Sequence, residues 1–285
     1  EDIFTKLYDH QIPPGAADVI QYRLEVPTTV TSPIELTVKL QYRKFDTAYT
    51  RAFLGDKFVR NDLPVTIIAE DRVVFPDETT ARADAPNIPE WQRWNDYGIG
   101  LLRKPDRGQF RQAEAAFRRV IKFNRPEGAL NLARVLLREG RLDEAVDALQ
   151  SAGRQGAYPW SIDWFGGLVD LQNGNLDAAI DSFIALTQTN YPDAKRRGFD
   201  FSLDYRLQNT LAQTLFERSK LSTSERSEIG WLERSVDHYE QSLQIDPENV
   251  TAHYGLAQAY ARLDRPVEAE KHRQLHETYR RDDNA

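Results

Sequence analysis

The sequence predicts a mainly α-helical chain in which a small antiparallel β domain precedes an array of paired helices. In the first third of the chain, apolar and polar residues alternate one by one, which is typical of half-buried strands. After Trp91 the apolar spacing becomes helical and small residues recur at long intervals, which is typical of stacked helix pairs. We therefore expect a tail and β domain over 1–85, a linker over 86–90 and the array over 91–285.

Two alternating stretches, residues 19–26 and 34–42, define the predicted β domain. Each places apolar side chains on one face and polar side chains on the other, and a proline-flanked segment separates them. We expect these stretches to pair, a short helix over 47–54, and one or two further strands over 64–75. A sheet of three or four strands needs cover, which the helices, upstream sequence or a partner strand would supply.

The helical part carries one small residue near the middle of each predicted first helix, where a neighbouring helix crosses too closely for a larger side chain. These residues are Gly98, Ala133, Gly167, Ala212 and Ala257. A second small residue follows about twelve positions later in three units, for example at Ala145. The spacing is about 34 residues where no insertion intervenes, and insertions are expected around 193–202 and 220–229. This pattern predicts a tetratricopeptide-repeat array, an α-α superhelix, of about five units.

Composition restricts the classes of function. The net charge of -7 argues against a nucleic-acid partner, because such binding depends on clustered cations. No apolar run approaches the roughly 20 residues of a membrane span. The absence of cysteine excludes disulfides, thiolate metal sites and covalently bound haem in this chain. Because the sequence contains no methionine, we expect a mature or partial chain.

The sequence offers little support for catalysis. It contains no phosphate-binding loop and no nucleophile elbow, so we predict a protein that is not an enzyme and has no metal site. His272 and His276 share a helix face and could bind a metal ion. The alternative prediction is therefore a metal-dependent hydrolase. His10 could ligate a partner's haem iron, although a turn residue is the simpler interpretation.

First helices line the inner wall of such a superhelix, chiefly three positions before and one position after the small residue, with arginines one turn further along. The predicted partner-binding side chains on this concave face are Asn95, Arg103, Arg134, Arg138, Trp164, Asn209, Gln213, Tyr254, Gln258 and Arg262. They form a polar, aromatic and arginine-containing surface suited to an extended or acidic peptide. A solvated groove without a ligand is the alternative interpretation.

The segments QIPPGAADV at 11–19, LQYRKF at 40–45, DLPV at 62–65 and WNDYGIGLL at 94–102 carry a resemblance to a known family. With these segments, the chain resembles the C-terminal part of the multihaem c-type cytochromes that contain tetratricopeptide repeats. The haem-binding part of that family is absent here. The resemblance implies a periplasmic or extracellular location and a multihaem cytochrome as protein partner, with haem only in that partner or in upstream sequence.

Together these observations predict a non-enzymatic protein-protein interaction module that holds a partner in or near an electron-transfer assembly. The alternative is a structural subunit or sheath of a larger cytochrome assembly. The partner's identity and the oligomeric state do not follow from the sequence.

Overall fold

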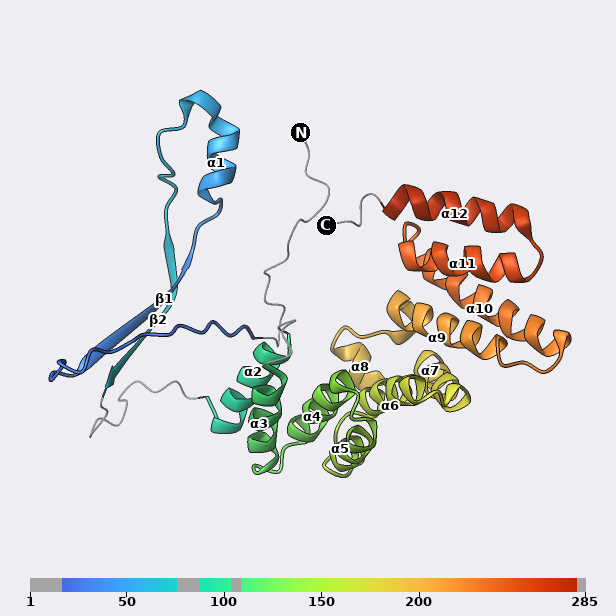
Figure 1. Ribbon diagram of the computed structural model, residues 1–285, viewed down its shortest axis with the longest axis horizontal. Helices are drawn as coiled ribbons and strands as arrows, with labels where there is room; N and C mark the ends of the chain where they lie inside the picture. The colour runs from blue at the N-terminus through green and yellow to red at the C-terminus, as the bar shows by residue number, and fades with distance from the viewer. Residues whose placement is uncertain (1–16, 76–87, 104–108, 281–285) are drawn as a thin grey trace. The chain divides into compact units, whose positions relative to one another are not determined.

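The computed structural model describes residues 17–75, 88–103 and 109–280, and Figure 1 shows its helices and strands. The chain divides into two compact units. One consists of Gln21–Asn87, and the other of Glu1–Ile20 together with Ile88–Ala285. We call the first the β unit and the second the helical unit, and we describe each by itself.

The β unit contains a two-stranded antiparallel ribbon of β1 (Ile34–Tyr42) and β2 (Thr66–Phe75). The register is regular from the pair Ile34–Phe75 to the pair Leu40–Ala69, after which Gln41 lies opposite Ile67. The connection holds α1 (Thr47–Leu54) and the short 3₁₀ helix η1 (Gly55–Lys57). Asp46 begins α1 by accepting a hydrogen bond from the Tyr49 backbone N–H at 2.6 Å. The predicted helix over 47–54 is confirmed.

The predicted pairing of residues 19–26 with 34–42 is wrong. Residues 19–26 are not in a strand, and β2 lies beside β1 instead. Within the described residues there are two strands, where three or four were expected. The start of the stretch packs on the helical unit: a Cβ on Gly100 would lie 2.7 Å from Val19 Cγ2, and Arg103 donates to the Ala17 carbonyl. Val19 is therefore part of the helical unit.

The helical unit is a succession of antiparallel helix pairs that follow one another along an arc in Figure 1. The pairs are α2 (Glu90–Leu102) with α3 (Phe110–Ile121), α4 (Pro126–Glu139) with α5 (Leu142–Arg154), α6 (Pro159–Asn173) with α7 (Leu176–Gln188), α9 (Tyr205–Ser219) with α10 (Glu225–Ile245), and α11 (Val250–Arg262) with α12 (Pro266–Arg280). This is the predicted tetratricopeptide-type architecture, and the fold class is confirmed.

Turn chemistry sets the helix boundaries. Gly140 and Gly174, at φ +74° and +80°, end α4 and α6 in the left-handed conformation that favours glycine. Proline begins α4 and α6, where its missing N–H costs no helical hydrogen bond. The first insertion forms α8 (Pro192–Arg196) and the 3₁₀ helix η3 (Phe201–Leu203). The second is a short turn after Ser219 followed by a 21-residue α10, which is longer than the other helices of the array.

The small residues lie where helices cross, as the sequence predicted. A Cβ on Gly167 would be 2.6 Å from Phe183 Cε1, and one on Gly98 would be 2.6 Å from Phe117 Cε1. Ala133, Ala212 and Ala257 are buried. Where α10 and α11 cross, a further glycine is required: a Cβ on Gly255 would overlap the Tyr239 ring. Only a residue without a side chain fits against that ring.

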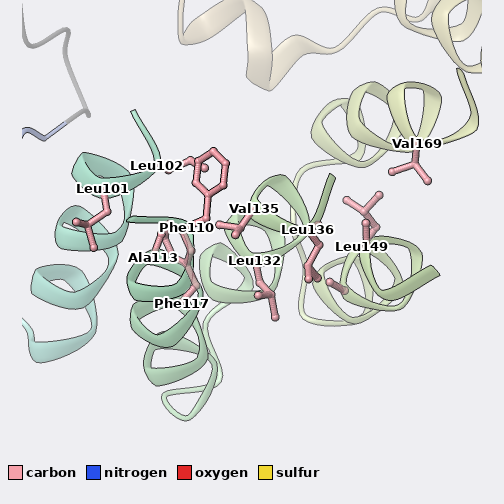
Figure 2. Close-up of a cluster of buried hydrophobic side chains, with 13 residues drawn as sticks. Leu101, Leu102, Phe110, Ala113, Phe117, Leu132, Val135, Leu136, Leu149 and Val169 are labelled. Atoms are coloured by element: carbon pink, nitrogen blue, oxygen red, sulfur yellow. The ribbon is translucent and has the colours of Figure 1, made fainter. Parts of the chain in front are cut away.

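Three hydrophobic clusters follow one another along the helical unit. Figure 2 shows the first, which extends from Leu101 of α2 to Val169 of α6 and is centred on residues such as Phe117 and Leu136. The second surrounds Phe183 and Leu211, and the third surrounds Leu232 and Leu256. Each cluster is shared by neighbouring pairs, so the units stabilise one another.

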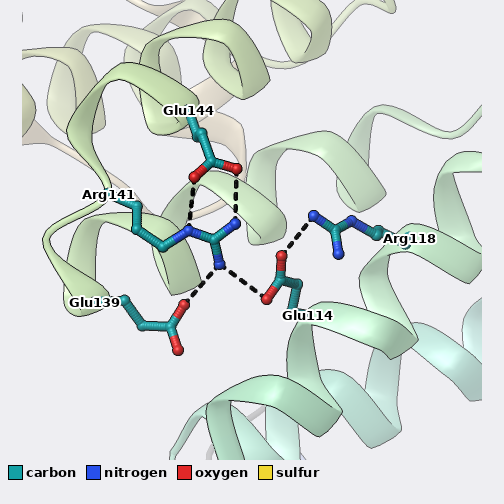
Figure 3. Close-up of polar contacts among 5 residues, drawn as sticks. All are labelled: Glu114, Arg118, Glu139, Arg141 and Glu144. Carbon is teal, nitrogen blue, oxygen red and sulfur yellow. Dashed lines mark hydrogen bonds and ion pairs between the residues drawn. The ribbon is translucent and has the colours of Figure 1, made fainter.

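A charged network joins α3 to the α4–α5 turn (Figure 3). Arg141 donates twice to Glu144, at 2.7 and 2.6 Å, and its Nη1 donates to both Glu114 and Glu139 at 3.0 Å. These carboxylates raise the pKa of Arg141, the hydrogen bonds to Glu144 being the largest cause. Glu114 is almost buried and pairs with Arg118 at 2.6 Å. Its charge is therefore neutralised from two elements.

Candidate protein-binding face

The first helix of each pair lies on the inner side of the arc. First helices of neighbouring pairs contact each other directly, as α2 does with α4, α4 with α6, and α9 with α11. Helices on the inside of a curve approach most closely, which places these helices on the inner side. The predicted partner-binding residues all lie on first helices or at their ends.

At the N-terminal end of the array, the predicted residues hold neighbouring helices together. Asn95 is buried and accepts a hydrogen bond from Asn131 Nδ2 at 2.9 Å. Arg134 Nη1 donates to Asn131 Oδ1 at 2.8 Å, and Arg138 Nη1 donates to the Leu102 carbonyl at 2.8 Å. Burial, followed by the charge of Arg138, lowers the pKa of Arg134. These side chains have structural partners, as Arg103 has in Ala17.

The central residues are also engaged within the array. Trp164 packs on Phe183, with ring centroids 5.6 Å apart, and belongs to the second hydrophobic cluster. Asn209 is buried and donates to Asn249 Oδ1 at 2.9 Å, while its own Oδ1 has no partner in the structure. Gln213, one turn further along α9, is exposed.

The C-terminal residues converge on one pocket. Tyr254, Gln258 and Arg262 line a concavity of about 580 Å³ between α9, α11 and α12. Tyr254 is 53% exposed, and its ring lies 5.3 Å from that of His276. The sequence did not place the remaining lining residues on the partner-binding face; they are Phe216, Lys220, Ala257, Ala261, Arg273, His276, Glu277 and Arg280.

The charges of this pocket are unequally distributed. Among the described lining residues there are four Lys or Arg side chains and one carboxylate, Glu277. The carboxylates paired with Lys220, Arg262 and Arg273 are Glu217, Glu228 and Glu270, and these are not lining residues. The cations therefore face the pocket while their paired carboxylates lie outside its lining.

His253, His272 and His276 are engaged in the packing of α11 against α12. His253 Nε2 donates to the Pro247 carbonyl at 3.0 Å, so in the neutral ring its Nδ1 accepts from His272 Nδ1 at 3.0 Å. His276 Nδ1 lies 3.1 Å from the Val250 carbonyl. Burial lowers the pKa of His253, and burial together with His253 lowers that of His272 to about 4. His10 lies outside the described residues.

These contacts bear on the alternative prediction of a metal-dependent hydrolase. The Nδ1 atoms of His272 and His276 have different neighbours, His253 and a backbone carbonyl. In the described ranges, no group of three or more His, Asp or Glu side chains is arranged to hold a metal ion. Nor does any helix there have the length and apolar character needed to cross a membrane.

Two profiles of the tetratricopeptide-repeat type match the sequence. One covers residues 106–159, which include α3 to α5, and the other covers residues 228–264, which include most of α10 and all of α11. This chain contains tetratricopeptide repeats. The second matched segment contains both Tyr239 and Gly255, which meet where α10 and α11 cross. A search of curated proteins found no match.

Solved structures of MamA resemble the tetratricopeptide array. MamA from residue 41 to its end, from Desulfovibrio magneticus RS-1, superimposes with a TM-score of 0.52 and 16% identity, over 68% of this chain and 97% of that chain. An RS-1 MamA double mutant gives the same TM-score and identity over 68% and 96%. Another MamA structure gives 0.50 and 17% over 66% and 91%. At these identities the likeness establishes the fold alone.

Proposed function

We propose that this tetratricopeptide-repeat protein is a non-enzymatic scaffold that binds a partner protein at the C-terminal end of its inner face. The observation that carries the proposal is the convergence of Tyr254, Gln258 and Arg262 on one pocket. Asn95 and Arg138, further toward the N-terminus, are hydrogen-bonded within the array, whereas Tyr254 is 53% exposed at the pocket. The C-terminal pocket is therefore the best place for a ligand.

The chemistry of the pocket favours a peptide segment that brings carboxylates next to an apolar side chain. Arg262 and Lys220 flank the Phe216 ring at 5.9 and 4.8 Å, so donors and an apolar surface lie together. A carboxylate gains charge-assisted hydrogen bonds from such donors, and the exposed Tyr254 ring offers contact area for an apolar neighbour.

Affinity capture from native extract followed by mass spectrometry tests this proposal. The wild-type chain is compared with the double variant Tyr254→Ala/Gln258→Ala, and the matched control is Gln241→Ala, an exposed change on α10 away from the pocket. Partners retained by the wild type and by the control should be lost with the double variant. Equal recovery by all three chains would contradict the proposal.

For the cellular context, we extend the proposal to an exported electron-transfer assembly with a multihaem c-type cytochrome as partner, in the periplasm or outside the cell. The family resemblance of the sequence supports this context, and haem would belong to the partner. Co-purification of the native protein tests it: haem absorbance should accompany the chain. Purification of a stable native complex without haem would contradict it.

A second candidate function is that of a structural subunit in such an assembly. The observation that favours it is the exposed apolar face of the β unit, since a subunit buries such surface against its neighbours.

A further inference from the structure

The ribbon of the β unit leaves much apolar surface exposed. Opposite residues of an antiparallel pair point to the same face, so Leu36 with Val73 and Ile34 with Phe75 share one face with Val38 and Leu40. Asp71, opposite Val38, is the one charged residue on this mainly apolar face of the two strands. Val38 is 64% exposed, Leu40 56% and Phe75 50%. A two-stranded ribbon is marginally stable in water, whereas three or more strands with an apolar face can be stable.

The two outer edges of this ribbon differ. In β2 one extra residue, Ile68, interrupts the register between Ala69 and Ile67. Such a bulge obstructs further pairing, and the adjacent acidic residues Glu70 and Asp71 at the centre of β2 would repel a second copy of this strand. By contrast, β1 is a regular strand of nine residues. Among the described residues, its one ladder partner is β2.

We propose that the free edge of β1 pairs antiparallel with β1 of a second copy of this chain, about a two-fold axis at Val38. This register uses the whole strand. It places Leu36 opposite Leu40 of the second copy, Ile34 opposite Tyr42, and Val38 opposite Val38, all on the apolar face. The result is a four-stranded sheet in which the apolar side chains of β1 continue across the seam.

The charges on the polar face fit the same register. Within one ribbon, Arg72 pairs with Glu35, and Lys39 pairs with Glu70 at 3.1 Å. Across the new seam, Glu35 faces Gln41 and is diagonal to Lys39 of the second copy, within reach of a long side chain. The diagonal contact between Glu35 of one copy and Lys39 of the other, which we call a seam pair, then connects two ion pairs. The charges alternate along the row Arg72, Glu35, Lys39 and Glu70, the first two from one copy and the last two from the other.

Other arrangements fit less well. Centring the axis on Lys39 would set two lysines directly opposite, and centring it on Thr37 would shorten the ladder. The chain's own residues 21–26 could reach the edge as a hairpin, but pairing Val26 with Ile34 would set Glu25 opposite Glu35, and residues 21–26 are not in a strand in the structure. A second copy therefore satisfies the edge better than the chain itself.

Two measurements on the full chain test the proposal. The first uses the absence of native cysteine. Residues directly opposite across an antiparallel seam have Cα atoms about 4.5–5.5 Å apart, within the range for a disulfide. Val38→Cys should form a disulfide-linked dimer under mild oxidation. The matched control, Val59→Cys, is 89% exposed but outside the strands and should stay monomeric on a denaturing gel.

The second measurement reverses charges while preserving the ribbon's own ion pair. The double variant Lys39→Glu/Glu70→Lys keeps an intramolecular pair but places a carboxylate at position 39, diagonal to Glu35 of the second copy. Sedimentation equilibrium should show a dimer for the wild type and a dissociation constant about tenfold higher for this variant, since two seam pairs turn from attraction to repulsion. Circular dichroism of the variant should match that of the wild type.

Three results would overturn the proposal. The first is a wild-type chain that stays monomeric up to about 100 μM, the micromolar range in which weak specific association appears. The second is a dimer whose affinity is unchanged by the charge exchange, because it would use another surface. The third is cross-linking by Val59→Cys that equals cross-linking by Val38→Cys. Since the C-terminal pocket is a different surface, partner capture there can succeed or fail independently of these results.

Discussion

Adjacent glycines in α6 provide a sharp test of the helical crossings. A Cβ at Gly167 would lie 2.6 Å from Cε1 of the fully buried Phe183 ring, whereas a Cβ at Gly166 would have no atom within 4 Å. Glycine to alanine inside a helix gains about 0.5–1 kcal/mol. We expect Gly166→Ala to stabilise the protein by that amount. Gly167→Ala gains the same but incurs an overpacking cost of about 1–3 kcal/mol.

The net expectation for Gly167→Ala is a loss between about 0 and 2.5 kcal/mol, in contrast to the gain at Gly166. Urea unfolding followed by circular dichroism at 222 nm measures both variants under one protocol. Adding Phe183→Leu should reduce the difference between glycine and alanine at position 167, because the smaller side chain makes room. If Gly167→Ala proved as stabilising as Gly166→Ala, the reasoning about tight crossings would be refuted.

Three further predictions concern buried polar groups. Between pH 6.5 and about 4, the unfolded chain binds protons that the buried His253–His272 pair does not, so the free energy of unfolding should fall as pH falls. The loss should be about 2 kcal/mol for His272 once solvent screening is allowed for. Thermal melting at stepped pH checks this, and a flat profile would contradict it. Arg141→Met should lower the midpoint of urea unfolding, because it leaves the carboxylate of the buried Glu114 with one partner, and adding Glu114→Gln should recover part of the loss. Ser235→Ala should cost about 1 kcal/mol by the same assay, since the hydroxyl donates to the Ala212 carbonyl at 2.7 Å, and no change would show that this bond is dispensable.

The sequence predicted the helical array because its decisive constraint is local and repeats. Where helices cross closely, a residue such as Gly167 must be small, and this requirement leaves a spacing that can be read directly. The helix over 47–54 was predictable for a similar reason, since Asp46 provides a cap. The boundary between the β part and the array stays a prediction.

The strand pairing was not predictable in the same way. Alternation shows which face of a strand is apolar, but it does not show which neighbour the strand takes. Residues 19–26 alternate as clearly as 34–42 do, yet Val19 packs against Gly100, a contact between positions about 80 residues apart. Nothing in the local spacing of residues 19–26 indicates that contact.

The candidate site was partly predictable. Helical register places Tyr254 and Arg262 on one face, and the structure brings them to the same pocket. Helical register does not show which side chains hydrogen-bond to residues of a neighbouring helix. It could therefore not indicate that Asn95 accepts a hydrogen bond from Asn131. Arg273 and His276 were missed because they reach the pocket through the docking of α12 on α11. Whether the predicted residues contact a partner stays a prediction.

The three hydrophobic clusters have a mechanical consequence. Each extends over only a few consecutive helices, and polar links such as Arg138 to Leu102 and Asn209 to Asn249 span about one repeat. A chain pulled from its C-terminus would therefore lose α12 and α11 while Phe117 and its neighbours stay packed. Under load, such a molecule should lengthen in discrete steps as its helix pairs unfold one after another.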